Sequence, residues 1–308
     1  MKNRIIIFAL VFVLAGIGTC FSYKINEGIQ KAKAQKILLA KRKKAWANLE
    51  KSIKSRVKKF KGTVGLEIKD LDKNWEISIN KKTLMPSASL VKIPIMMACF
   101  YAAQDSKISL KDRVRLKASK IVGGSKVLSK EPDGKLFSVD ELFSPMITES
   151  DNSASNLLIE FMGFDTLGVY FKKMSLKNTN ISRRMMDFQE REDGVENYTT
   201  AEDMAFLLEK LYRRSFLNKS VSERCLALLG EQKINDRIPK MLPKEGTFIA
   251  HKTGLERSVC HDVGIVFTGK GDFLICVMVR HKNKYAQPAK KLIADIALLT
   301  YNYYQDSG

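Results

Sequence analysis

The sequence predicts an α+β domain in which both ends of the chain contribute strands to one sheet. Three observations lead to this prediction. Apolar and polar residues alternate over residues 64–79, strand patterns resume over about 247–280, and residues 104–240 between them show mostly helical patterns. A last helical pattern covers about 287–304. We therefore expect a five-stranded antiparallel sheet flanked by helices, plus an all-α lobe.

The first segment, residues 1–22, is typical of an export signal. Lys2 and Arg4 precede a continuous apolar run from Ile5 to Leu14, and small residues follow this run. The whole apolar stretch lies at the lower limit of what spans a bilayer, so a cleaved signal peptide and a membrane anchor are both open. Either one predicts a periplasmic or extracellular domain, free or anchored to the cytoplasmic membrane.

The net charge of +20 is concentrated in an N-terminal arm. Residues 23–61 hold 14 Lys and Arg and only two acidic residues, whereas residues 62–308 hold 37 basic and 31 acidic residues. We expect a basic spacer at 23–45 and a folded domain at 46–308. An anionic membrane or wall polymer is the favoured partner of the arm. Nucleic acid is disfavoured, because no nucleic-acid recognition motif accompanies the charge.

The predicted domain begins with a helix and a hairpin. Apolar residues from Trp46 to Phe60 recur at helical spacing. Residues 64–69 and 75–79 alternate between apolar and polar side chains, which predicts an antiparallel hairpin. The next helix is expected to begin near Ser87, and Pro94 is expected to distort it, because proline removes one backbone hydrogen bond.

Capping signals mark helices of the expected all-α lobe. Ser138-Val139-Asp140-Glu141 is a capping box, and the segment from Ser220 to Glu223 resembles one. Gly163 is expected to end the helix that follows Ser150. The strands resume at about residues 247–253, 259–268 and 273–280.

Three short motifs occur in a fixed order. They are Ser89-Leu90-Val91-Lys92, Ser150-Asp151-Asn152 and Lys252-Thr253-Gly254. The first places an amine one helical turn from a hydroxyl, the second adds a hydroxyl and an amide, and the third places a cation on a strand. This set suits acyl transfer by a nucleophilic serine. Two other S-x-x-K segments, at Ser55 and Ser78, lack comparable surroundings.

With these motifs the chain resembles class A β-lactamases and penicillin-binding proteins, from about Leu49 to the C-terminus. The segments Asn197–Thr200 and His261–Gly264 add to the resemblance. It implies the β-lactamase/D,D-peptidase-like fold and a serine acyl-enzyme formed with β-lactams or D-Ala-D-Ala-like substrates. Metal-ligand spacing and C-x-x-C are absent from the sequence, so we expect no metal and no cofactor.

The resemblance implies a role for each motif residue. Ser89 would be the nucleophile, and Lys92 would take its proton, which requires a neutral amine. A second cation nearby, such as Lys252, would lower the pKa of Lys92. Ser150 would pass a proton to the leaving nitrogen, in contact with Lys252. Asp151 is expected to cap a helix and not to act as a catalyst.

Further motif residues are expected to bind the substrate. Asn152 would hold the amide side chain of the substrate, and Thr253 would bind its carboxylate together with the preceding lysine. Backbone N–H groups of Ser89 and Leu255 would form the oxyanion hole. Gly254 would allow the strand to approach closely, whereas Leu255 is bulkier than expected and would change the shape of the pocket.

Deacylation departs from the class A pattern, because the E-x-x-L-N segment is absent. Counting from Ser150 by the usual spacing of the family leads to the segment from Arg184 to Asp187, and Asp187 is the nearest carboxylate. Glu190 and Glu192 follow in a charged run that is typical of a solvated loop. Slow deacylation is therefore predicted. A β-lactamase, a peptidoglycan D,D-peptidase or transpeptidase, and a non-catalytic wall-binding module remain open.

The histidines and cysteines are interpreted as structural. A Ser-His-Asp triad would be the rival scheme, but no G-x-S-x-G segment surrounds any serine. We therefore expect His251 and His261 to be structural residues beside the site. Cys99, Cys225 and Cys276 lie in apolar runs and are expected to be buried free thiols.

Overall fold

The computed structural model describes residues 2–307, with side chains from residue 26 to residue 306. The chain divides into two units, one ending at Lys51 and the other running from Ser52 to Asp306. Helix α1 (Lys2–Lys59) is continuous through the positions where the predicted signal and the basic spacer end. The division into signal or anchor, spacer and domain therefore stays a prediction.

The N-terminal apolar stretch falls on residues whose side chains are outside the described part. Among the residues that the structure describes, no helix combines the length and the apolar content needed to cross a bilayer. Whether residues 1–22 are a signal peptide or an anchor stays a prediction.

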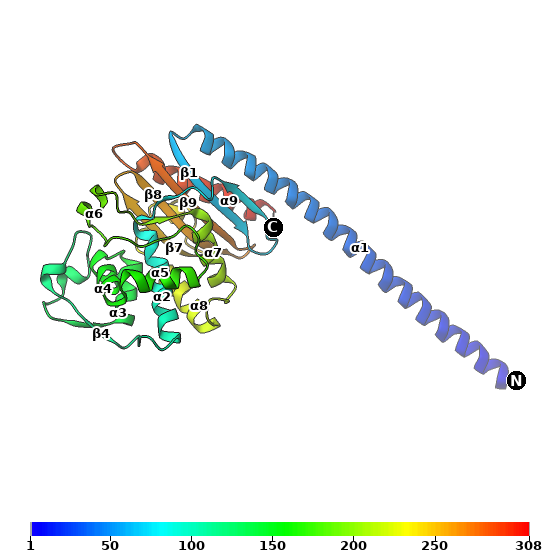
Figure 1. The fold of residues 1–308 in the computed structure, drawn as a ribbon. Helices are drawn as coiled ribbons and strands as arrows, with labels where there is room; N and C mark the ends of the chain where they lie inside the picture. Colours follow the sequence, from blue (N-terminus) through cyan, green and yellow to red (C-terminus); the bar gives the residue numbers. More distant parts are fainter. Residues whose placement is uncertain (1, 308) are drawn as a thin grey trace. The chain divides into compact units, whose positions relative to one another are not determined.

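A five-stranded sheet forms the centre of the second unit (Figure 1). The strand order is β2-β1-β9-β8-β7, and every neighbouring pair is antiparallel. The strands are β1 (Gly62–Asp70), β2 (Glu76–Ile79), β7 (Thr247–Glu256), β8 (Val259–Thr268) and β9 (Phe273–His281). The predicted sheet, with strands from both ends of the chain, is confirmed. The third motif lies on β7, at one edge of the sheet.

Helices cover both faces of this sheet, so its central strands are buried on both sides. Strand β8 is buried from Val259 to Val266, and β9 is buried from Phe273 to Val279. Helix α7 (Ala201–Tyr212) packs against β1, β8 and β9. Helix α9 (Gln287–Ser307) lies along the sheet on the side away from the helical lobe (Figure 1). The near-continuous apolar pattern of the C-terminal strands follows from this double cover.

The predicted helical lobe is present. Its longer helices are α2 (Lys92–Gln104), α3 (Val139–Thr148), α4 (Asn152–Met162), α5 (Phe164–Lys173) and α8 (Lys219–Gly230). Two short strand pairs brace it, β3 (Met85–Pro86) with β6 (Tyr198–Thr199) and β4 (Arg113–Arg115) with β5 (Leu136–Ser138). Aromatic packing in the core includes Phe100 and Phe143, whose ring centroids lie 5.0 Å apart.

Most of the predicted helix caps are confirmed. Ser138 and Glu141 form the capping box of α3, and Gly163 ends α4 with a φ of 76°. The prediction for Ser220 is wrong, because α8 begins at Lys219 and Ser220 lies inside its first turn. Asn218 caps this helix by accepting a hydrogen bond from the backbone N–H of Val221. Asparagine competes well with serine as a cap, so the earlier residue takes the position.

The segment that carries the first motif differs from the predicted helix. A 3₁₀ turn, η1 (Ala88–Val91), comes first, and α2 begins at Lys92. Pro94 therefore lies in the first turn of α2, where backbone N–H groups have no i→i−4 partner within the helix. The expected distortion does not follow, because no such hydrogen bond is lost there.

The cysteines with described side chains are all free and buried. Burial raises the pKa of the Cys99 thiol and that of the Cys225 thiol to about 12. The prediction of buried free thiols at Cys99, Cys225 and Cys276 is confirmed. Cys260 is buried and free as well, and its sulfur accepts a hydrogen bond in the site described next.

Candidate active site

The three motifs of the sequence meet at one serine hydroxyl. Ser150 follows α3, and its Oγ accepts a hydrogen bond from Lys252 Nζ at 3.0 Å. The same Oγ lies 3.3 Å from Lys92 Nζ. Ser89 lies in η1, three residues before Lys92, and a 3₁₀ turn aligns the side chains at positions i and i+3. The hydroxyl of one motif thus bridges the amines of the other two.

The environment of Lys92 favours a neutral amine. Its side chain is fully buried. Burial lowers the pKa of Lys92 well below its usual value, and the nearby Lys252 lowers it further. Its Nζ donates short hydrogen bonds to Ser150 O at 2.7 Å and to Asn152 Oδ1 at 2.8 Å. A neutral amine has two hydrogens, so these two bonds leave its lone pair free to accept a proton.

Lys252 is also buried, but charges of both signs act on it. Burial lowers the pKa of Lys252 to about 7, with Asp262 opposing this effect and Arg237 adding to it. Its Nζ donates to the Oγ of Ser150 and, at 3.1 Å, to Thr253 O. The Ser150 hydroxyl therefore lies between two buried amines whose pKa values are both lowered.

Arg237 is a component of the site that the sequence analysis missed. It is 1% exposed, and its Nε donates to Cys260 Sγ at 3.2 Å. Its Nη1 lies 3.1 Å from Asp236 Oδ1. This buried cation lowers the pKa of Lys252, although among the described residues no hydrogen bond or ion pair joins it to the motif residues. No motif surrounds it, so only the fold reveals its place.

The second motif is held by its central carboxylate. Asp151 Oδ1 accepts from the N–H of Ala154, and Oδ2 accepts from the N–H groups of Val127 and Leu128, all at 3.0 Å. The prediction that Asp151 caps a helix is confirmed. These bonds fix the chain at Ser150, which has a φ of 58°.

The amide of Asn152 is partly committed within the protein. Its Nδ2 donates to Gly123 O at 2.7 Å, while its Oδ1 accepts from Lys92. One hydrogen of Nδ2 remains for a ligand. Gly124 lies against this amide, since a Cβ at this position would lie 2.7 Å from Nδ2.

The edge strand approaches the turn that carries Ser89. A Cβ on Gly254 would lie 3.2 Å from Ser87 O and 3.3 Å from the Cβ of Ala88. Glycine therefore permits this close approach, as the sequence suggested. Ala88 has a φ of 46°, in the left-handed region that alanine seldom adopts. Leu255 follows on β7, and its side chain is 47% exposed.

The two histidines near the site are bound to other groups. His261 Nε2 donates to Pro86 O at 2.9 Å, its Nδ1 accepts from Val279 N, and burial lowers its pKa to about 4. His251 contacts Asp262 through Nδ1 at 2.9 Å, but its Nε2 faces Asn235 Oδ1 at 3.1 Å. A Ser-His-Asp triad is thus not formed, because an asparagine occupies the place of the serine.

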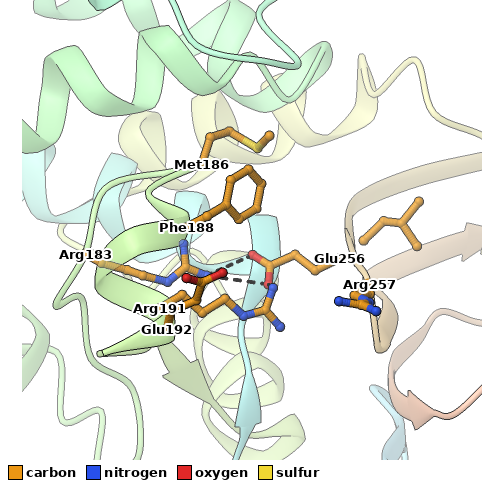
Figure 2. A pocket seen from close by; sticks show the side chains of 8 residues that line it. Arg183, Met186, Phe188, Arg191, Glu192, Glu256 and Arg257 are labelled. Atoms are coloured by element: carbon orange, nitrogen blue, oxygen red, sulfur yellow. Dashed lines mark hydrogen bonds and ion pairs between the residues drawn. The ribbon is translucent and has the colours of Figure 1, made fainter. Parts of the chain in front are cut away.

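A cavity of about 590 Å³ lies between the end of β7 and the loop around α6 (Phe188–Glu192). Figure 2 shows Arg183 and Arg191 converging on the carboxylate of Glu256. Arg183 is 2% exposed and also pairs with Glu196 at 2.7 Å. These ion pairs join the loop to β7. The cavity is lined by Arg183, Met186, Phe188, Arg191, Glu192, Leu255, Glu256 and Arg257.

The same loop is fixed from the other side by Asn156. Its Oδ1 accepts from Met185 N at 2.7 Å, and its Nδ2 donates to Met185 O at 3.0 Å. Met185 is buried, at 5% exposure. Asp187 caps α6 by accepting from Glu190 N at 3.3 Å. Among the hydrogen bonds and ion pairs of the described residues, none joins Asp187 to the motif residues.

A family model described as "Beta-lactamase enzyme family" matches residues 48–304, which is most of the chain. The chain belongs to this family. It is a serine hydrolase of the class A β-lactamase type and has the β-lactamase/D,D-peptidase-like fold, as the resemblance implied.

Two curated relatives from Pseudomonas aeruginosa are similar over most of their length. Beta-lactamase VEB-1 is 24% identical over 273 residues, which are 83% of this chain and 90% of the relative. Extended-spectrum beta-lactamase PER-1 is 26% identical over 83% of this chain and 87% of its own.

Solved structures of two kinds are similar to this one. A β-lactamase from Sphaerobacter thermophilus is 28% identical, with a TM-score of 0.75, covering 84% of this chain and 97% of its own. The protein PBP-A is 27% identical, with a TM-score of 0.76, covering 84% and 96%. A variant of PBP-A, solved as an acyl-enzyme complex with penicillin G, has the same identity and TM-score.

Proposed function

We propose that Ser89 is the nucleophile of an exported acyl-transfer enzyme that reacts with β-lactams and releases the acyl group slowly. The observation that carries this proposal is the Ser150 hydroxyl, which bridges two buried lysines, Lys92 and Lys252, beside the turn of Ser89. A serine hydroxyl needs a base to become a nucleophile, and a neutral lysine is such a base.

Acylation proceeds through these groups as follows. The lone pair of Lys92 takes the proton of the Ser89 hydroxyl while Oγ bonds to the carbonyl carbon of the substrate. The carbon–nitrogen bond then breaks, and Ser150 gives its proton to the leaving nitrogen. Lys92 returns a proton to Ser150 across their 3.3 Å contact, so the amine is neutral again. Lys252 remains charged and stabilises the developing negative charge.

The remaining motif residues hold the substrate. Lys252 and Thr253 bind its carboxylate, and the free hydrogen of the Asn152 amide binds its acylamino group. The backbone N–H groups of Ser89 and Leu255 form the oxyanion hole, a contribution of roughly 3 kcal/mol for each donor in related chemistry. The cavity beside Leu255 gives the acyl side chain room.

Slow deacylation follows from the loop around α6. Hydrolysis of the acyl-enzyme requires a base within hydrogen-bond reach of a water near the ester. Asp187 is the proposed base, but one of its oxygens caps α6. Asn156 binds the backbone of Met185, a buried residue of the same loop. The side chain of Met185 cannot act as a base. The proposed site thus has a base and a proton donor for acylation, but it has no well-placed base for hydrolysis of the acyl-enzyme.

This imbalance favours a second candidate, a D,D-peptidase or transpeptidase acting on peptidoglycan peptides. Such an enzyme transfers its acyl group to an acceptor or to water slowly. It therefore needs no efficient base for deacylation. Similarity to PBP-A, at 27% identity, adds support. A D-Ala-D-Ala peptide should then acylate Ser89 and release D-alanine. A non-catalytic wall-binding module would form no acyl-enzyme with either substrate.

Export and surface binding complete the proposal. The positive and apolar pattern of residues 1–22 supports export. The basic residues of 23–61 support attraction to an anionic membrane or wall polymer.

Intact-mass spectrometry over time, after addition of penicillin, tests the chemistry. Ser89→Ala should abolish the added mass, whereas Ser55→Ala should not, although Ser55 also begins an S-x-x-K segment. The added mass should persist, because hydrolysis is slow. Labelling that survives in Ser89→Ala would remove Ser89 from its role, and rapid loss of the adduct would refute slow deacylation.

A charge change at Asp187 tests the proposed base separately. Asp187→Asn keeps the cap of α6, because asparagine caps helices as well as aspartate does. We expect this variant to lose its penicilloyl group more slowly and to acylate at the normal rate. Equal rates of loss in the two proteins would make Asp187 a capping residue only.

A further inference from the structure

A second cavity, also of about 590 Å³, lies apart from the motif residues. Its walls come from β1, from the turn after β2, from the segment after α5 and from the first half of α7. None of the residues that we assign to acylation lines it. The cavity therefore needs an explanation of its own.

The inner wall holds a buried carboxylate with an unused oxygen. Glu67 on β1 is 1% exposed. Its Oε1 lies 3.0 Å from Lys69 Nζ, but its Oε2 has no hydrogen-bond partner among the described residues. The nearest cation to Oε2 is Lys81 Nζ, 3.6 Å away. Burial raises the pKa of Glu67 in spite of these two lysines, which shows how poorly the carboxylate is solvated. A buried acceptor without a donor is costly, so a ligand that supplies one gains affinity.

The rim of the cavity holds cations that are not engaged by close partners. Lys82 is exposed, and Glu202 Oε1 lies 3.9 Å from its Nζ. Lys177 is exposed, and its ammonium forms no ion pair within the described part of the chain. An anionic group at the rim would therefore find two available ammonium groups. The aromatic ring of Phe206, 36% exposed, gives the cavity an apolar surface between polar groups.

We propose that this cavity binds a small carboxylate that also carries a neutral hydroxyl or amide N–H group. The carboxylate would lie between Lys82 and Lys177, and the neutral donor would reach Glu67 Oε2. An ammonium group is disfavoured as the donor, because Lys69 and Lys81 already place two positive charges beside Glu67. Acylamino acids and sugar acids share the required chemistry, and both combine it with carbon atoms that suit the ring of Phe206.

Calorimetric titration of the full chain tests this proposal with three probes. N-acetylglycine represents an acylamino acid, glucuronate represents a sugar acid, and propionate is a carboxylate without a neutral donor. Binding of the first probe alone assigns acylamino acids, and binding of the second alone assigns sugar acids. We expect propionate to bind at least about tenfold more weakly than the better probe, because it lacks one hydrogen bond to a charged group.

Two variants and a control locate the binding. Glu67→Gln should weaken binding of the better probe at least about tenfold, because it removes the charge from the acceptor. Lys177→Gln changes an exposed side chain, preserves the fold and should weaken binding as well. Lys219→Gln, at an exposed lysine of α8, is the control and should bind normally. The proposal is overturned if neither N-acetylglycine nor glucuronate binds. It is also overturned if Lys177→Gln binds normally, or if propionate binds as tightly as the better probe.

Discussion

Acylation of Ser89 should slow as the pH rises through about 7, because Lys252 then loses its proton. The pKa of Lys252 in the free protein is about 7, chiefly because the amine is buried. The second-order rate constant for acylation reports the pKa values of the free enzyme. Loss of one essential proton should make this constant fall about tenfold for each pH unit above the pKa.

The lowered pKa of Lys252 should affect stability in the opposite direction to the acylation rate. The test can therefore separate the two effects. The fall of the pKa from 10.5 to about 7 corresponds to a preference of roughly 5 kcal/mol for the neutral amine in the folded protein. Between these two values the unfolded chain binds the proton and the folded chain does not. The contribution of Lys252 to the free energy of unfolding therefore rises with pH over this range. The effect of Lys252 on stability therefore runs opposite to its expected effect on the rate of acylation, and the two measurements separate them.

Stopped-flow labelling with a fluorescent penicillin gives the rate constant at each pH, and urea titration gives the stability. Arg237→Gln should move the alkaline fall in rate to higher pH, because it removes a charge that lowers the pKa of Lys252. Arg237→Lys keeps this charge and serves as the matched control. A rate constant that stays flat across the alkaline range would refute the assignment of Lys252 as the essential cation.

Three further predictions concern the supports of the site and the basic arm. Asn156→Ala leaves the N–H and carbonyl of Met185 unpaired and should lower the free energy of unfolding by about 1–3 kcal/mol, measured by urea titration; an unchanged midpoint would contradict this. Gly254→Ala should slow penicillin labelling, because its Cβ would lie 3.2 Å from Ser87 O, whereas Gly269→Ala meets no atom within 4 Å and should label normally. Equal labelling of Gly254→Ala and Gly269→Ala would contradict this, because it would show that β7 can shift to accept the Cβ. Deleting residues 23–51 should weaken binding to anionic vesicles at low salt in a sedimentation assay, and binding that ignores salt would exclude an electrostatic attraction.

Local periodicity was sufficient to predict the sheet and its neighbours along the chain. Strands such as Phe273–His281 carry long apolar runs, and the final helix carries a 3.6-residue repeat. Helix beginnings were harder to predict, because neighbouring residues compete for the same cap. Asn218 and Ser220 are both good caps, and the structure selects the first. The 3₁₀ turn at Ala88–Val91 has no distinct sequence signal, because its residues also suit an α-helix.

In the candidate site, the spacing of the motifs was sufficient to predict that Lys92, Ser150 and Lys252 lie together. The residues that support them were not predictable. Arg237 and Asn156 act through contacts with segments far away in sequence, such as Cys260 and Met185. Such contacts form only when the fold places Arg237 against β8 and α4 against the loop around α6. Nothing in the sequence distinguishes Arg237 from other arginines. It affects the pKa of Lys252 because the fold buries its charge near the site.

The arrangement of the two lysines bears on the proposal that this active site acylates well and hydrolyses poorly. In the proposed mechanism both amines serve acylation, since Ser150 Oγ lies within 3.3 Å of each of them. The N–H groups of Lys92 donate hydrogen bonds to Ser150 O and Asn152 Oδ1, and these bonds hold the amine in place. A water on the other side of the ester requires a different base, on the loop around α6. There the bonds from Asn156 hold Met185, and the nearest candidate, Asp187, caps a helix. We therefore expect the loop around α6, and not the lysines, to decide whether the protein hydrolyses β-lactams or is inhibited by them.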